Sequence, residues 1–133
     1  MNGEERHGLS FYETGSGNPA SYSAAVRAGD LIFTAGQIGV APGSEPMEFR
    51  AQAAEALSRV IQAVEAAGGG LETIVKVNGY LADLDDWPAY DELYRSIIGV
   101  HPKPARTTVQ IARFPEPILV EVDAVAVRRA PGP

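Results

Sequence analysis

The nine residues from Leu119 to Val127, LVEVDAVAV, alternate between two kinds of side chain. Successive side chains of an extended strand point to opposite faces. One face of this stretch is therefore wholly apolar, while the other carries two acids, Glu121 and Asp123. The pattern predicts a strand with one buried face and one face that presents carboxylates.

A second strand is predicted over Lys103 to Ile111, KPARTTVQI, where Pro104 restricts the backbone just before Arg106. Arginine is the side chain best shaped to bind a carboxylate, because its planar fork offers parallel donors and stays charged. If this strand pairs beside the first, Glu121 lies near Arg106. The two residues would then form either one site or an ion pair between strands.

Two amphipathic helices are predicted between the strands. From Met47 to Ala67 the apolar residues recur every three or four positions, and Gly68-Gly69-Gly70 ends that helix. This glycine run lacks a following Lys-Ser/Thr, so it is not a phosphate loop. The second helix begins at Asp85 or Asp86, runs to Val100, and has an apolar side made of Trp87, Tyr90, Leu93, Tyr94, Ile97 and Ile98.

Further strands complete an α+β pattern in a single domain, 9–133, after a tail over residues 1–8 that we expect to be mobile. Ser44 is a candidate cap for the first helix. Between the two helices, Val75, Val77 and Leu81 are predicted to share a buried face. The further predicted strands are Leu9 to Glu13, a hairpin of Ala24 to Arg27 with Leu31 to Ala35, Ile38 to Ala41 after the interruption Gly36-Gln37, and Ile74 to Asp83.

Composition excludes several classes of function. The 133 residues contain no cysteine, which rules out disulfides, thiolate metal sites and a cysteine nucleophile. The net charge of -6 repels phosphate backbones, so we expect no nucleic-acid partner. No run approaches the roughly 18 apolar residues that cross a bilayer, and we expect a cytoplasmic protein without a membrane partner.

Two helices can cover only one face of such a sheet. The uncovered face would combine acids with Val125 and Val127. It would carry too much charge to be a hydrophobic core, and too many apolar side chains to be fully exposed to water. Burial against copies of the same chain would resolve this conflict, so a homo-oligomer is predicted.

Five segments together resemble a known family, the reactive intermediate deaminases, also called RidA or YjgF-like and often labelled endoribonuclease L-PSP. The resemblance runs from about Tyr22 to Val127. Its segments are FTAGQIGV, AAGGGLETIVKVNGYLADL, DDWPAYDELY, KPARTTVQIARFP and LVEVDAVAV, of which the last two, at this separation, are the most specific.

The resemblance implies a chorismate-mutase-like α+β fold, with a mixed sheet, two helices on one face, and a homotrimer whose sheets form a central barrel. It also implies active sites in the clefts between subunits. Members of the family hydrolyse 2-imino or enamine acids to 2-keto acids and ammonia, and they need no cofactor or metal. The expected partner is thus a small imino or keto acid.

Site residues follow from the resemblance position by position. Arg106 matches the carboxylate-binding arginine, and Glu121 matches the acid that positions or activates water. Tyr22 matches a tyrosine that closes the site, and Gly36 matches a backbone contact.

Three positions depart from the family pattern. Thr108 stands where well-known members have cysteine, Ala35 where they often have serine, and Asp91 where they have asparagine. Thr108 should be tolerated because that position acts mainly through its backbone. An added charge at Asp91 would disfavour an anionic ligand.

Two other functions remain in view. The same cleft would serve a non-catalytic protein that binds or senses small carboxylates such as keto acids. Ribonuclease action is suggested only by the family's label, and it would need a basic track that this sequence lacks.

Overall fold

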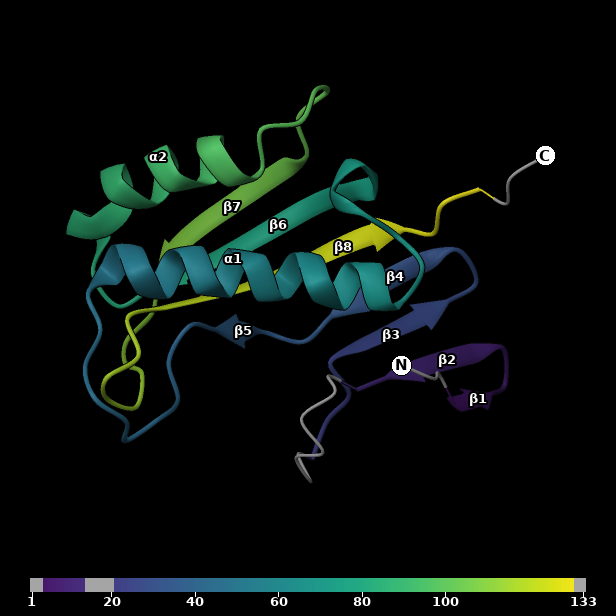
Figure 1. Cartoon of the computed structure of the whole chain (residues 1–133), viewed down its shortest axis with the longest axis horizontal. Helices are drawn as coiled ribbons and strands as arrows, with labels where there is room; N and C mark the ends of the chain where they lie inside the picture. The colour runs from purple at the N-terminus through teal and green to yellow at the C-terminus, as the bar shows by residue number, and fades with distance from the viewer. Residues whose placement is uncertain (1–3, 14–20, 131–133) are drawn as a thin grey trace.

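The computed structural model describes residues 4–13 and 21–130, which form one mixed sheet with both helices on a single face (Figure 1). This arrangement confirms the predicted α+β class. The strands are β1 (Glu4–Arg6), β2 (Leu9–Tyr12), β3 (Ala25–Ala28), β4 (Leu31–Thr34), β5 (Gln37–Ile38), β6 (Ile74–Leu81), β7 (Ala105–Gln110) and β8 (Val120–Val127); the helices are α1 (Phe49–Ala66) and α2 (Trp87–Ile97).

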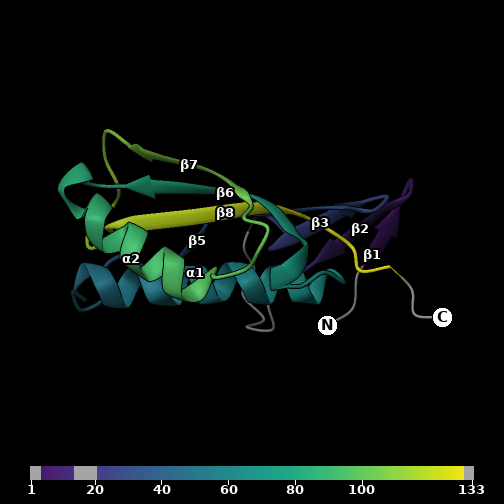
Figure 2. The ribbon, with the colours of Figure 1, turned by 90° about the horizontal axis from the view of Figure 1, so that it is seen from above.

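The strand order is β1-β2-β3-β4-β8-β6-β7, and short β5 pairs with β8 beyond the end of β4. β6 and β7 run parallel because α2 carries the chain back between them, while the other pairs are antiparallel. Seen from above in Figure 2, α1 and α2 lie on the same side of the sheet. The other side, called here the open face, is not covered by either helix of the described residues.

The core lies between α1 and the apolar face of β8, whose residues Val120, Val122, Ala124 and Ala126 are all buried. The predicted alternation of this strand is confirmed. α1 contributes several small side chains to the contact, so it can lie close to the sheet. No helix in the described ranges is both long and apolar enough to cross a membrane.

Gln52 is a fully buried polar residue of α1, and its side chain forms hydrogen bonds to the loop that precedes β8. Its amide nitrogen donates to the carbonyls of Met47 and Pro117, each at 2.9 Å, and its oxygen accepts from the Leu119 amide at 2.9 Å. The amide side chain thereby fixes the loop that leads into β8.

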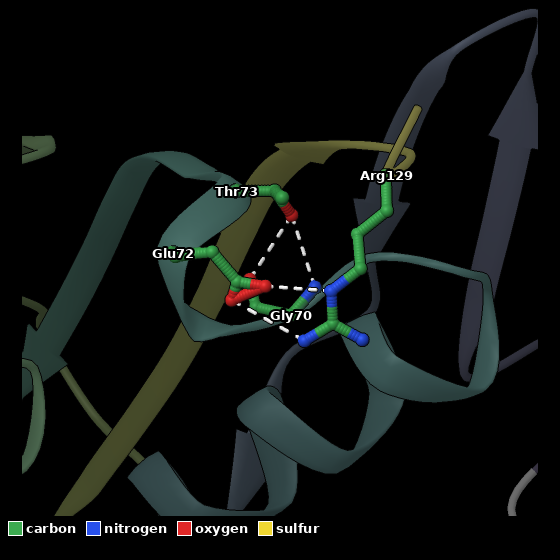
Figure 3. A network of polar contacts seen from close by, with 4 residues as sticks. All are labelled: Gly70, Glu72, Thr73 and Arg129. Carbon is green, nitrogen blue, oxygen red and sulfur yellow. Dashed lines mark hydrogen bonds and ion pairs between the residues drawn. The ribbon is translucent and has the colours of Figure 1, made fainter. Parts of the chain in front are cut away.

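The chain after β8 is tied to the turn that follows α1 (Figure 3). Gly68, which has a positive φ, stands two residues after the end of α1, and the 3-10 turn η1 (Leu71–Thr73) follows. Arg129 donates to both carboxylate oxygens of Glu72, at 2.6 and 3.3 Å, while the Thr73 hydroxyl bonds the backbone of Gly70. These contacts fix the direction of the chain where it leaves the sheet after β8.

Several local predictions are wrong. Glu4–Arg6 pairs with β2 and is not part of a mobile tail, and residues 1–3 lie outside the described ranges. Ser44 does not cap α1, which begins at Phe49. A register shift between Ile74 and Lys76 turns Val75 outward, and its exposed fraction is 45%. Trp87, expected in the core, is 38% exposed at the start of α2.

Candidate functional site

Arg106 lies on the helix side of the sheet, in the edge strand β7. Its register partner in β6 is Val77, a fully buried residue that faces the helices, so Arg106 points the same way. Its guanidinium lies 4.7 Å from the ring centre of Tyr94 and 5.5 Å from that of Trp87. Aromatic faces attract a cation at such distances, so α2 holds the group in place.

Asp91 of α2 accepts hydrogen bonds from two arginines. Arg106 Nη1 reaches one carboxylate oxygen at 2.8 Å, and Arg95 Nε reaches the other at 2.9 Å. These bonds, first that from Arg95 and then that from Arg106, hold the pKa of the Asp91 carboxyl below its usual value. The charge that distinguishes this position from asparagine is therefore offset by two cations.

Glu121 lies on the open face, in β8. Its register partners are Tyr80 in β6 and Ile38 in β5. The carboxylate packs against the bare α-carbon of Gly36, where any Cβ would overlap it. Burial, and then the neighbouring charge of Asp123, raise the pKa of Glu121 above its usual value. A raised carboxyl pKa suits a group that both takes and returns a proton.

Asp123 organises a polar network beside Glu121. It accepts from the Asn78 side-chain amide at 2.7 Å and from the Tyr80 hydroxyl at 2.8 Å. Burial and the bond to Asp123 raise the pKa of Tyr80 to about 12, so this hydroxyl stays a donor. The sequence showed that these three residues share a face, but not that they bond one another.

The prediction that Arg106 and Glu121 lie near each other within one chain is wrong. β6 stands between β7 and β8, and the register directs Arg106 to the helix side and Glu121 to the open face. The alternative of an ion pair between them is also wrong, because the carboxylate paired with Arg106 is that of Asp91. The chain thus presents two half-sites: Arg106 with Asp91, and Glu121 with Gly36.

The remaining predicted residues fall around these half-sites. Thr108 faces the helices two positions after Arg106, and its buried hydroxyl has no hydrogen-bond partner in the described part of the chain. Ala35 donates its backbone N–H to the Ala24 carbonyl at 2.8 Å, next to Gly36. Tyr22 is 65% exposed, so its ring is available for contact with another molecule.

The two half-sites supply complementary chemistry. Arg106 has donors beyond the single bond to Asp91 and can bind a carboxylate through them. Glu121 can move a proton to or from water. Among the described residues there is no group of three or more His, Cys, Asp or Glu placed to hold a metal ion.

Comparison with known proteins places this chain among a consistent set of relatives. The family model described as Endoribonuclease L-PSP matches residues 16–128. The 2-iminobutanoate/2-iminopropanoate deaminase of Escherichia coli K12 is 38% identical over 112 residues, which are 81% of this chain and 88% of that protein. A RutC family protein of Pyrococcus horikoshii is 34% identical over 110 residues, covering 80% and 86% respectively.

Solved structures show the same likeness in three dimensions. Escherichia coli TdcF with bound serine gives a TM-score of 0.78 at 34% identity, over 90% of this chain and 98% of that one. The YjgF gene product of Escherichia coli gives 0.73 at 35% identity, over 89% and 94%.

Proposed function

Because this chain belongs to the endoribonuclease L-PSP family, also called the RidA or YjgF family, we propose that it hydrolyses 2-imino acids to 2-keto acids and ammonia. The observation that carries the proposal is the placement of Arg106. Its guanidinium is held at a sheet edge by Asp91, Tyr94 and Trp87, with further donors left for a substrate carboxylate.

We propose further that each active site forms between two subunits of a homotrimer. Arg106 and Glu121 face opposite sides of one sheet, so a single ligand can reach both only if they come from different chains. The open face supports such an assembly, because Leu31, Phe33 and Val109 are each more than 40% exposed there. Tyr22, also exposed, would close the site from the subunit that supplies Glu121.

The chemistry requires little beyond positioning and proton transfer. Arg106 binds the carboxylate and fixes the imine carbon, which is already electrophilic. Starting from the protonated imine, Glu121 takes one proton from water as the C–O bond forms and the C=N double bond becomes single. It returns that proton to nitrogen, the C–N bond breaks to release ammonia, and the hydroxyl gives its remaining proton to Glu121 as the carbonyl forms. Glu121 then passes this proton to the released ammonia, so the products are the 2-keto acid and ammonium; no cofactor enters the balance.

The test is Arg106→Lys, which replaces the planar guanidinium and its parallel hydrogen-bond donors by a compact ammonium group. With imino acid supplied by an amino acid oxidase, the rate of keto acid and ammonia release gives kcat/KM. Charged hydrogen bonds are worth about 1.5–3 kcal/mol, so a fall of about ten- to a hundredfold is expected. Arg113→Lys, at an exposed arginine after β7, is the matched control. Parent-like activity of Arg106→Lys would contradict the proposal.

A second candidate is a binding or sensing protein for small carboxylates. The separation of Arg106 from Glu121 within one chain favours this binding function if the protein is a monomer. In a monomer, Arg106 would bind a carboxylate without Glu121 nearby to transfer a proton. Calorimetry showing tight keto acid binding, together with no turnover of imino acids by the same preparation, would select this function.

A further inference from the structure

A pocket of about 400 Å³ lies between the end of α2 and the start of β7. It borders Arg106 and Asp91, but most of its wall lies outside the two half-sites. Its polar wall includes Arg95, His101 and Lys103, which the proposed reaction does not use.

Positive charge is concentrated in this pocket. Three of the eleven Lys and Arg residues line it, namely Arg95, Lys103 and Arg106, against one carboxylate, Asp91. Without His101 in the count, the lining carries three positive charges and one negative, a net charge of +2, in a chain whose net charge is -6. Asp91 already bonds both arginines, and Lys103 makes no ion pair with any described residue. The pocket therefore has positive charge left for a ligand.

The remaining pocket wall is mostly apolar. Tyr94 lines the pocket, but its hydroxyl oxygen is buried and has no hydrogen-bond partner in the described ranges, so the charged contacts of a ligand fall to the cations. Ile98, Val100 and Pro104 also line the pocket, and their low polarity strengthens the attraction between an anion and the cations.

We propose that this pocket is a second anion subsite, contiguous with Arg106, and that the preferred substrates are imino acids with a second acidic group. The inference rests on the proposed function, in which Arg106 binds the first carboxylate. The second anionic group lies against Lys103 and Arg95. A neutral side chain in the same place would leave Lys103 without an opposite charge.

Keto acids, the reaction products, are suitable binding probes. Calorimetry at low salt compares 2-oxobutanoate, with one carboxylate, and 2-oxoglutarate, with two. We expect the parent to bind the diacid at least about tenfold more tightly, the equivalent of one good charged contact. Lys103→Gln and Arg95→Gln should each lower this ratio toward one. The matched control is Arg59→Gln, because Arg59 and Arg95 are both exposed helix residues paired with an acid four positions earlier.

The outcomes separate this inference from the proposed function. Equal affinity of the parent for both acids overturns the subsite alone, provided that Arg106→Lys weakens the binding of each. A diacid preference that survives in both pocket variants also overturns it. If neither acid binds the parent, the subsite is overturned, whereas the proposed function is decided separately by the effect of Arg106→Lys on the rate of imine hydrolysis. Salt gives a check that needs no variant: the preference must shrink toward about 1 M salt, where the Debye length is only about 3 Å.

Discussion

The carboxyl groups of the two half-sites, Asp91 and Glu121, have pKa values displaced in opposite directions. Hydrogen bonds from Arg95 and Arg106 lower that of Asp91, whereas burial and Asp123 raise that of Glu121. A carboxylate that stays ionised is suited to holding a cation, and one that protonates more easily is suited to proton transfer. These environments support the roles proposed above, with Asp91 as the partner of Arg106 and Glu121 as the acid that activates water.

Glu121→Gln should lower activity and raise stability. Loss of a general base costs about 10²–10⁴ in rate, so kcat/KM should fall within that range. The folded state holds the Glu121 proton more tightly than the unfolded chain does, so the ionised group destabilises the fold above its ordinary pKa of 4.5. Thermal unfolding at pH 7 should therefore show a higher Tm in the variant. This advantage should shrink as the pH falls through the raised pKa of Glu121 toward 4.5, and it should be absent below that value. Unchanged kcat/KM would remove Glu121 from the mechanism.

At the scale of elements, the position of α2 depends on the lack of a side chain at Gly79. A Cβ there would lie 2.7 Å from the Tyr90 hydroxyl oxygen and 2.9 Å from the ring carbon that bears it. Tyr90 is fully buried, and its ring centre lies 6.0 Å from that of Tyr94, which in turn contacts Arg106. Close packing of α2 on β6 thus supports the arginine.

Gly79→Ala should therefore destabilise the protein by about 1–3 kcal/mol, the usual cost of overpacking. Tyr90→Phe removes the nearest atom, a hydroxyl without a partner in the described residues. The double variant should recover part of the loss, because the ring carbon remains close. Urea unfolding of the parent, both single variants and the double variant completes the cycle. A parent-like midpoint for Gly79→Ala would contradict this packing argument.

At the scale of the whole molecule, the proposed assembly requires the open face to be buried between subunits, so that the two half-sites can meet. Phe33→Asp places a charge on this face and should shift the protein to a monomer, which analytical ultracentrifugation would detect. Activity should fall with it, while the circular dichroism spectrum stays that of the parent. Met47→Asp, at a similarly exposed residue just before α1, is the control. A parent that already sediments as a single species at monomer mass would remove the assembly proposal.

The sequence predicted the faces of individual strands better than the neighbours of each strand. The alternation in β8 fixed its buried side, because side-chain direction follows from the backbone alone. The relation of Arg106 to Glu121 depended instead on which strand lies between them and on its register. A shift of one residue moves every side chain of a strand to the other face, and nothing within β7 or β8 encodes the intervening β6. The Asp91 pairs were missed for a similar reason, since they depend on the packing of α2 against β7.

The edge position of β7 has a consequence for handling the isolated chain. Only one side of this strand is hydrogen-bonded, to β6, within the described residues. Its other edge offers amide and carbonyl groups on which a foreign strand could add, as in fibril growth. The composition ARTTVQ, with a cation and three polar side chains in six residues, reduces that hazard. Mutations that make this segment more hydrophobic should therefore promote aggregation before they weaken folding.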